Sequence, residues 1–558
     1  MRSFSKDYRA NPKALNQFFS HAFNSAEDTR EIMFRRSQKG FSAFVRSNLE
    51  QQNKQRSSAV ERTLKKLSQP GVTAAVSGQQ AALLGGPLMV LYKCLATARW
   101  ATYLEQLNDT PVVPIYWLQT EDHSVREINH INYLSAEGTR KRFEVNLGDD
   151  ESMISTAFRQ FQTPFANTIA ELKSSLSWLP QTQQIFSLLD DGLAQSTNAV
   201  DSFRAVLNIC TDQLGILFFD PTKLDSINGP SSDTRVHPDD PRPNIFTRTI
   251  NNFREIESAL LTRSDDLALA GYATQVPIKA DSPLCFFHPL GKTESRSRLL
   301  VKDGSCLLER TPGNRGSNQQ TADISLPEML SLAKSRPELF SPSALLRPLL
   351  QDSLFPTAVY IGGPAEVSYL AQSATLYPLF DIEMPLVAPR PHFTVIDAKT
   401  KRLLADTELD ASEVLENPAV LNEADSAIDK QASQQQEQSS DKFVAIFKEL
   451  KQDFGEISPA LGQSVDTFSN RFFQQFAGLY QKYANALKEK QSVRRSRLSK
   501  LADILMPDNA PQERNLSLLF ALCKYGPGFP QMVYQRIDPI KPDNQLLQIE
   551  DTGPGNLP

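Results

Sequence analysis

The stretch VTAAVSGQQAALLGGPLMVLYK (72–93) decides how we interpret the fold. Its first six residues, 72–77, have the composition of a buried strand, and Gly-Gly-Pro at 85–87 precedes a helix-forming run. The next apolar segment, PVVPIYWLQTED (111–122), is rich in Val, Ile and aromatic residues and ends in polar ones. A strand, a helix and a second strand joined in this way predict a parallel pair in an α/β sheet.

Three later stretches extend this sheet in our interpretation. GILFFD (215–220) is a short apolar run, and FPTAVYIGGPAEVSYLAQ (355–372) repeats the order strand, Gly-Gly-Pro and helix. We assign MPLVAPRPHFTVID (384–397) to the same sheet. Strands that alternate with helices in this order predict an α/β protein with a parallel-sheet core.

The rest of the chain divides by composition. Apolar residues at helical spacing occupy the N-terminal part and stop at Pro70-Gly71. Mixed helical and polar stretches separate the predicted strands, as insertions into a core sheet do. We predict a helical segment at 1–70 that packs on the core, a core at 71–400 with insertions at about 140–215 and 225–340, a helical coiled-coil domain at 401–510, and a segment at 511–558 that returns to the core.

A long amphipathic pattern marks the predicted coiled coil. Apolar residues recur every three or four positions over 443–454 and again over 461–487, which predicts two long helices that form a hairpin. The glutamine-rich tract at 431–440 indicates a solvated loop or helix end. The apolar stripe either packs within its own hairpin or contacts a second chain. An exposed strip of this length favours a homodimer through 441–505.

The charge balance excludes several classes of protein. The chain has 59 Lys and Arg against 64 Asp and Glu, a net charge of −5, so it lacks the basic surplus of a general nucleic-acid binder. The basic run at 488–500 has no interleaved aromatic residues and indicates a solvated helix face. No apolar run approaches the ~18 residues of a membrane span. We expect no nucleic-acid partner and no membrane segment.

The N-terminus and the cysteines indicate the compartment. The chain begins with charged and polar residues where a secretory signal has a continuous apolar stretch. Its 5 cysteines are scattered and form no disulfide framework. We therefore expect a cytoplasmic protein with reduced thiols.

Polar side chains follow the first predicted strand, and open parallel sheets bind their ligands at the carboxyl ends of strands. Gly78 allows a sharp turn there, and Gln79 and Gln80 offer uncharged amide groups. Gly86 opens a helix whose first N–H groups can receive an anion. Lys93, almost two turns into that helix, either reaches back toward a phosphate or packs as a surface lysine.

The second predicted strand is followed by Glu121, Asp122 and His123, with Asn129 a few residues later. Consecutive residues of an extended chain point to opposite sides, so Asp122 and one or other of its neighbours, not all three residues, would face a common pocket. Such a segment can supply a base for an ammonium nucleophile or a carboxylate for a ribose. Helix capping by Asp122 and Ser124 is the structural alternative.

The third cluster begins at the second Gly-Gly-Pro, where Gly363 precedes Glu366 at the predicted helix start. A carboxylate there either complements the helix dipole or holds a ligand amine. A metal site is not expected, because the histidines do not form an H-E-x-x-H pattern and Cys285 with His288 has no second pair at ligand spacing.

Four strings taken together resemble one known family, the BshC cysteine-adding enzymes of bacillithiol synthesis. They are SGQQAALLGGPL (77–88), EDH with INH (121–130), LRPLLQDSLFPTAVYIGGPAEVSYLAQ (346–372) and PQERNLSLLFALCKYG (511–526). The resemblance keeps their order and extends from Asp7-Tyr8 to about residue 535. It is weaker at 225–330 and in the glutamine-rich tract.

The resemblance implies a Rossmann-like core related to class I aminoacyl-tRNA synthetases and other nucleotidyltransferases, with connecting-peptide insertions and a coiled coil that makes a homodimer. It also implies a ligase that adds L-cysteine to the amine of glucosaminyl malate, the last step of bacillithiol formation. The chain has no obvious H-I-G-H or K-M-S-K-S string. ATP activation of the cysteine carboxylate is accordingly inferred from fold kinship.

The ligase is the first of two hypotheses for the function of this chain. A second hypothesis, from a different class, is a non-catalytic, dimeric nucleotide-binding or scaffold protein of the same pathway. The missing synthetase strings favour it, and the ionisable residues at the strand ends argue against it. For the ligase, we predict catalytic roles for Lys93, Asp122 and His123, nucleotide or phosphate contact for Gly78, Gln79 and Gly86, and substrate contact for Gln80, Asn129, Arg347, Gly363 and Glu366.

Overall fold

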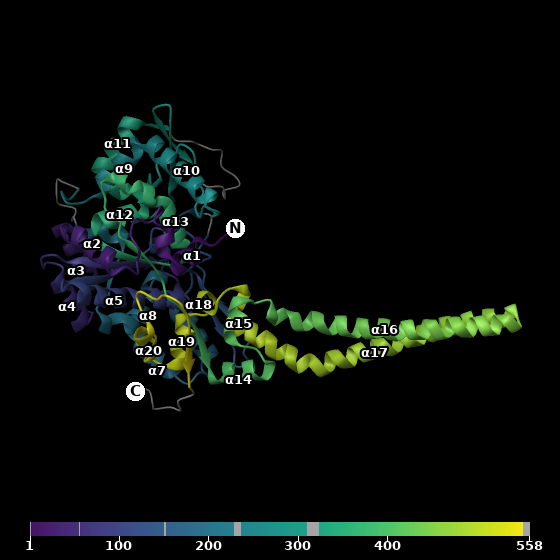
Figure 1. Cartoon of the computed structure of the whole chain (residues 1–558). Coiled ribbons are helices and arrows are strands. Elements are labelled where there is room, and N and C mark those ends of the chain that lie inside the picture. Colours follow the sequence, from purple (N-terminus) through teal and green to yellow (C-terminus); the bar gives the residue numbers. More distant parts are fainter. Residues whose placement is uncertain (1, 55, 150–151, 228–235, 310–322, 551–558) are drawn as a thin grey trace.

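The computed structural model describes residues 2–54, 56–149, 152–227, 236–309 and 323–550. Parts of the predicted insertion at 225–340 and of the predicted C-terminal segment at 511–558 lie outside these residues. Figure 1 shows a rounded body and one long helical hairpin that projects from it.

The core is a five-stranded parallel sheet with the order β12-β11-β1-β2-β5. Its strands are β1 (Thr73–Gln79), β2 (Val112–Leu118), β5 (Leu217–Phe219), β11 (Thr357–Gly362) and β12 (Leu386–Pro389). The predicted parallel pair of β1 and β2 is confirmed, with register from Thr73↔Val112 to Gln79↔Leu118. Strands are added on both sides of β1, so a switch in strand order lies beside it, where such sheets bind ligands.

The stretch 384–397 is only partly in this sheet, which corrects our assignment. β12 ends at Pro389, and β13 (His392–Asp397) pairs in parallel with β14 (Asn544–Ile549) in a separate two-stranded sheet. The sequence Pro-Arg-Pro at 389–391 explains the break, because proline has no N–H to donate to a strand ladder.

Helices cover the core sheet. α5 links β1 to β2 and buries apolar residues on all sides, as a helix enclosed by other elements does. The N-terminal helices pack on the core, and Tyr8 donates a hydrogen bond to the Val387 carbonyl of β12 at 3.0 Å. The helices around the sheet are α1 (Phe4–Ala10), α2 (Ala26–Ser37), α3 (Ala43–Asn53), α4 (Ser58–Lys66), α5 (Leu88–Asn108), α8 (Ala199–Thr211) and α13 (Pro364–Ser373).

Two insertions interrupt the core. The first contains the hairpin of β3 (His130–Leu134) and β4 (Arg140–Glu144), and then α6 (Phe165–Ser175) and α7 (Thr182–Ala194). The second contains an antiparallel sheet of order β10-β6-β7-β8-β9, which the sequence did not reveal. Its elements are α9 (Arg242–Asn251), α10 (Phe253–Leu269), β6 (Cys285–Phe287), β7 (Ser297–Lys302), β8 (Ser305–Glu309), β9 (Asp323–Ser325), α11 (Leu326–Ser335) and β10 (Phe340–Pro342), followed by α12 (Arg347–Leu354).

The projecting hairpin consists of α16 (Val420–Ile457) and α17 (Pro459–Leu505), and it leaves the body through α14 (Ala398–Thr407) and α15 (Ala411–Glu416) (Figure 1). The two predicted long helices are confirmed. The glutamine-rich tract at 431–440 lies inside α16 and is neither a loop nor a helix end. Glutamine is a good helix former, and the partner helix supports the tract, because Tyr480 donates to the Gln435 carbonyl at 3.2 Å.

The hairpin packs on itself through aromatic side chains. The ring centroid of Phe443 lies 4.8 Å from that of Phe472, and the ring of Phe447 lies 5.2 Å from the same Phe472 ring. Other large apolar side chains of the hairpin face outward: Phe468 is 63% exposed and Leu479 is 62% exposed. The hairpin therefore has an internal core and a separate exposed apolar surface.

The C-terminal segment returns to the body, where its helices contact α5 and α7. They are α18 (Gln512–Asn515), α19 (Leu518–Tyr525) and α20 (Phe529–Arg536). Across the described ranges, no helix combines the length and the apolar character that crossing a membrane requires.

Candidate active site at the carboxyl ends of the sheet

A cavity of about 540 Å³ opens at the carboxyl ends of β1, β2 and β11. It is lined by most of the residues that the sequence singled out: Gln79, Gln80, Lys93, Asp122, Arg347, Gly363 and Glu366. Gly86 lines an adjoining cavity of about 350 Å³, which shares Gln79 and Gln80 with the first. Gly78, His123 and Asn129 do not line either cavity.

Gly78 lies within β1 and makes no turn, contrary to our expectation. A Cβ atom at this position would lie 2.7 Å from the Trp117 carbonyl oxygen of β2. Glycine is needed here because the two backbones approach closely, so its contribution to the site is indirect.

Lys93 is buried in α5 and ties two parts of the site together. Its Nζ donates to the Gly78 carbonyl, to the Gln79 Oε1 at 3.1 Å and to the Glu366 carboxylate. These contacts use all three N–H bonds of the ammonium group, so Lys93 is not a surface lysine and has no donor left for a phosphate in this state. Burial lowers the pKa of Lys93 to about 8, although the Glu366 charge opposes the shift.

Glu366 lies in the first turn of α13, and both of its carboxylate oxygens accept hydrogen bonds. Its Oε2 accepts from the Gly363 backbone N–H at 2.8 Å and from Lys93, and its Oε1 accepts from the Tyr360 hydroxyl at 2.7 Å. Burial opposes ionisation, but the charges of Lys93 and Arg347 outweigh it and lower the pKa of this carboxyl. Lys93 and Glu366 therefore form a buried ion pair that joins α5 to the start of α13.

Asp122 faces the cavity as a carboxylate. Its Oδ2 accepts from the Gln80 side-chain amide, and its Oδ1 accepts from the His123 backbone N–H at 2.7 Å. Burial alone would favour the neutral acid. The hydrogen bonds from His123 and Gln80, together with the charge of Arg296, outweigh burial and hold the pKa of Asp122 well below its usual range.

The neighbouring Glu121 behaves differently although it lines the same cavity. Burial raises the pKa of its carboxyl, and the Lys292 ammonium, 3.4 Å from Oε1, only partly offsets that effect. Two adjacent carboxyl groups with opposite pKa shifts can play different roles in one reaction.

His123 contacts the site through Arg296. Its Nδ1 lies 2.8 Å from an Arg296 Nη2 atom, and a guanidinium group only donates hydrogen bonds. Nδ1 therefore accepts from Arg296, and it also lies 3.3 Å from Asp122 Oδ1. The lone pair that a base would use is occupied, and the catalytic role of His123 stays a prediction.

Asn129 is held at the base of the β3–β4 hairpin. Its Nδ2 donates to Glu144 Oε1 at 2.6 Å, and its Oδ1 lies 3.3 Å from the Nδ1 of His130. The structure does not bring Asn129 to the other predicted residues, because the chain turns away after Asp122 to form the hairpin.

The main cavity is also lined by four arginines that we did not predict from the sequence: Arg296, Arg298, Arg390 and Arg514. Arg390 directly follows β12, so the same reasoning from the carboxyl ends of parallel strands could have predicted it. Arg514 belongs to a string already quoted at 511–526. Arg298 lies in β7 of the second, antiparallel sheet and Arg296 directly precedes that strand, so the reasoning from parallel strand ends gave no signal for either residue.

A buried network fixes the C-terminal segment against the sheet. Glu513 of α18 accepts from Arg390 at 2.8 Å and from the Phe393 backbone N–H at 3.2 Å, and its Oε1 lies 2.7 Å from His392 Nδ1. Burial and the charge of Arg390 lower the pKa of His392 to about 4. This network places the neighbouring Arg514 at the cavity wall.

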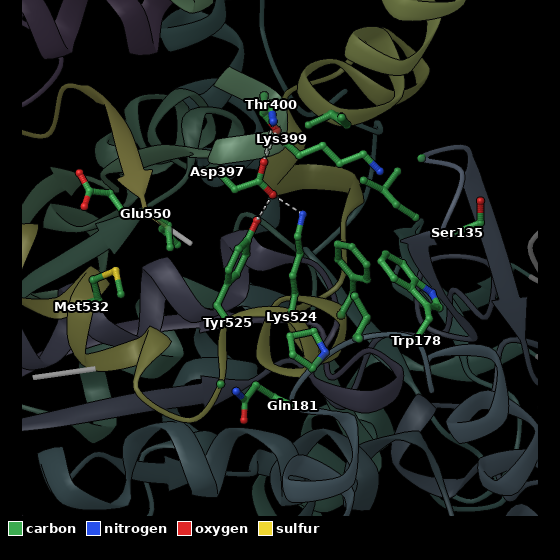
Figure 2. Close-up of a pocket in the computed structure, with 18 of the residues that line it drawn as sticks. Ser135, Trp178, Gln181, Asp397, Lys399, Thr400, Lys524, Tyr525, Met532 and Glu550 are labelled. Atoms are coloured by element: carbon green, nitrogen blue, oxygen red, sulfur yellow. Dashed lines mark hydrogen bonds and ion pairs between the residues drawn. The ribbon is translucent and has the colours of Figure 1, made fainter. Parts of the chain in front are cut away.

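A third cavity, of about 930 Å³, lies between β13, α14 and the 525–528 turn, and no predicted site residue lines it. Figure 2 shows Lys524 and Tyr525 directed at Asp397, whose carboxylate also accepts from Thr400. Within the described part of the chain, no group of three or more His, Cys, Asp or Glu side chains is arranged to hold a metal ion.

Comparison with known proteins adds to this geometry. The model of the N-terminal Rossmann-like domain of BshC, a protein of bacillithiol biosynthesis, matches residues 1–391. The model of the BshC C-terminal coiled-coil domain matches residues 393–549. This chain belongs to the BshC family. The Rossmann-like core, the coiled coil and the family resemblance expected from the sequence are thereby confirmed.

Relatives within the BshC family match most of this chain at low identity. The "Putative cysteine ligase BshC" of Solibacter usitatus is 27% identical over 491 residues, which are 87% of this chain and 86% of the relative. The protein of the same name from Geobacillus sp. (strain WCH70) is 27% identical and covers 85% and 83%. That of Bacillus cytotoxicus is 24% identical and covers 94% of each chain.

Proposed function

We propose that this chain is a ligase that joins L-cysteine to the amine of glucosaminyl malate, the last step of bacillithiol formation. The observation that carries the proposal is the BshC match, which extends over residues 1–391 and 393–549. The charged cavity at the carboxyl ends of the sheet supports it, because amide formation from an amine and a carboxylate needs groups that move protons and hold charge.

In this proposal Asp122 binds the acceptor amine and Glu121 accepts its proton. The ionised Asp122, oriented by Gln80, holds the ammonium group through a charge-assisted hydrogen bond. The ammonium must lose a proton before its nitrogen can attack a carbonyl carbon. Glu121 accepts that proton, because its raised pKa makes it a stronger base than Asp122.

In this proposal the phosphates and nucleoside of ATP bind in the adjoining smaller cavity. Gly86 has a φ of +66°, and α5 begins beside it without a side-chain cap, although the first N–H of the helix, that of Leu88, already donates to the Leu516 carbonyl at 2.9 Å. Asn132 lines this cavity, is 5% exposed, and has an Oδ1 with no partner in the described structure. ATP, when bound, would convert the cysteine carboxylate into an activated acyl group beside Gln79 and Gln80.

We also propose that two copies associate through the α16–α17 hairpin. Outward-facing apolar residues, among them Phe468 and Leu479, support this because soluble chains rarely leave such a surface uncovered. The hairpin projects from the body (Figure 1), and residues of the body line the cavity, so dimerisation and catalysis are separable in this proposal.

The direct test is a mass-spectrometric assay of the purified protein with cysteine and glucosaminyl malate, with and without ATP. We expect the cysteinyl amide only when ATP is present, with one nucleotide consumed for each product formed. A protein that binds ADP but forms no product under any condition would contradict the ligase and favour the non-catalytic scaffold.

A further inference from the structure

The main cavity carries an excess of positive charge. Among the described residues that line it, six are cationic and three are anionic, whereas the whole chain has a net charge of −5. The cationic residues are Lys93, Arg296, Arg298, Arg347, Arg390 and Arg514. A cavity with this charge, in a chain of opposite sign, points to an anionic ligand.

Three of these cations are neutralised by carboxylates of the protein itself. Lys93 pairs with Glu366, Arg390 with Glu513, and Arg298 lies 3.9 Å from Glu309. Arg296 and Arg347 differ, because neither has a carboxylate within 4.0 Å in the described ranges although they are only 7% and 9% exposed. The charges of Asp122 and Glu366 stabilise these two guanidinium groups only from beyond ion-pair distance. Both groups can therefore form a direct ion pair with an anionic ligand.

Arg296 is held flat at the cavity wall. Its guanidinium carbon lies 4.0 Å from the centroid of the Phe286 ring, and its two terminal nitrogens contact the Glu121 carbonyl at 2.9 Å and His123 at 2.8 Å. Its Nε is buried and has no hydrogen-bond partner in the described structure. A fixed guanidinium plane with an unused donor suits a carboxylate oxygen.

Arg347 approaches the same cavity from the start of α12. Its Nη2 donates to the Tyr369 hydroxyl at 2.5 Å and lies 3.4 Å from the Tyr360 hydroxyl, and its Nη1 lies 3.4 Å from Gln351 Oε1. All these partners are neutral. They fix the side chain, and the Glu366 charge stabilises it without a direct ion pair.

We propose that Arg296 and Arg347 bind the two carboxylates of the malyl group of the acceptor, and that they select it from sugars without that group. The inference rests on the proposed function for the identity of the acceptor. Arg296 contacts both the Glu121 carbonyl and His123, so a carboxylate held there lies close to the groups assigned to the acceptor amine. Phosphates are assigned to the smaller cavity, which Arg296 and Arg347 do not line.

The test is calorimetric binding of three probes to the full-length protein: glucosaminyl malate, methyl glucosaminide as the acceptor without carboxylates, and ADP. We expect Arg296→Gln and Arg347→Gln each to weaken binding of glucosaminyl malate by about 10- to 100-fold, the usual range for a lost charge-assisted hydrogen bond. Binding of methyl glucosaminide and of ADP should stay within about threefold. The lysine variants Arg296→Lys and Arg347→Lys, which keep the charge, should recover part of the loss.

Arg298→Gln is the matched control, because Arg298 lines the same cavity and also faces Phe286 but already lies near Glu309. An equal loss in this control would overturn the assignment, since it would show a general field effect in place of two specific contacts. A loss of ADP binding with unchanged binding of glucosaminyl malate would overturn it as well.

The two proposals fail separately. Wild-type protein that forms product, with all arginine variants at the parent affinity for glucosaminyl malate, would refute the arginine subsite and leave the ligase standing. Wild-type protein that binds glucosaminyl malate through Arg296 and Arg347 and forms no product would refute the ligase and leave the subsite standing. Variants that do not fold are replaced by the lysine substitutions, whose binding decides the question.

Discussion

The carboxyl edge of the sheet and the α16–α17 hairpin place their side chains in opposite ways. At the sheet edge, charged groups such as Lys93 and Glu366 are buried and satisfy one another within the chain. On the hairpin, apolar groups such as Phe468 and Leu479 stay exposed after the internal aromatic contacts are made. The first arrangement fixes a site within one chain, and the second leaves a surface that a second chain can cover.

The largest expected effect comes from breaking the buried pair. Lys93→Met should leave Glu366 as an uncompensated buried carboxylate and lower the free energy of unfolding by about 3–5 kcal/mol. Activity should be lost with it, because Lys93 ties β1 to the start of α13. Urea denaturation and the mass-spectrometric assay measure the two effects.

The matched control for this pair is Lys66→Met, since Lys66 and Glu105 form an ion pair that is about one-third exposed on both sides. It should cost at most about 1 kcal/mol. The double variant Lys93→Met with Glu366→Gln should be more stable than the sum of the two single losses. Strict additivity would show that the two groups are not coupled.

Single variants of Glu121 and Asp122 test whether the two carboxylates have different roles at the sheet edge. Glu121→Gln should lower kcat by about 10²- to 10⁴-fold, because it removes the proposed proton acceptor. Asp122→Asn should mainly raise KM for glucosaminyl malate, because it weakens the hold on the ammonium group. The wild-type rate should rise with pH as Glu121 loses its proton, and this limb should disappear in Glu121→Gln. The reverse pattern would exchange the two roles.

The hairpin is tested by charging its exposed face. Phe468→Glu with Leu479→Glu should convert the proposed homodimer into monomers in sedimentation. Each substitution should weaken association by about 10- to 100-fold because a large apolar side chain is no longer covered. Product formation per chain should change little. Phe472→Glu is the contrasting variant, since Phe472 packs inside the hairpin and its loss should melt the helices. Wild-type protein that is monomeric at micromolar concentration would contradict the dimer.

The smallest effect concerns the network that fixes the C-terminal segment. The pKa of His392 is about 4 in the folded chain and near 6.5 in the unfolded chain, so the unfolded chain binds the extra proton first as pH falls. Stability should decrease from pH 6.5 toward pH 4, and His392→Gln should remove up to about 1 kcal/mol per pH unit of that slope. Denaturation curves at pH 6.5 and pH 5 measure it, and an unchanged slope would contradict the assignment.

Local patterns were enough to predict the centre of the site. β1, β2 and β11 have apolar runs that end in polar residues, and parallel strands bring those ends to one edge, so Gln80, Asp122 and Glu366 meet as expected. The remaining features depend on distant partners. β13 pairs with β14 at 544–549, and Arg296 directly precedes β7 in a sheet whose short strands carry no clear pattern.

Amide formation by the proposed ligase depends on activation of the cysteine carboxylate as an adenylate. The measurement that tests this most directly uses cysteine with both carboxylate oxygens labelled with ¹⁸O, together with glucosaminyl malate and ATP, followed by mass spectrometry of products and nucleotides. We predict that each cysteinyl amide keeps one labelled oxygen and that the other appears in AMP. Absence of product, or product formed with unlabelled AMP, would contradict the account.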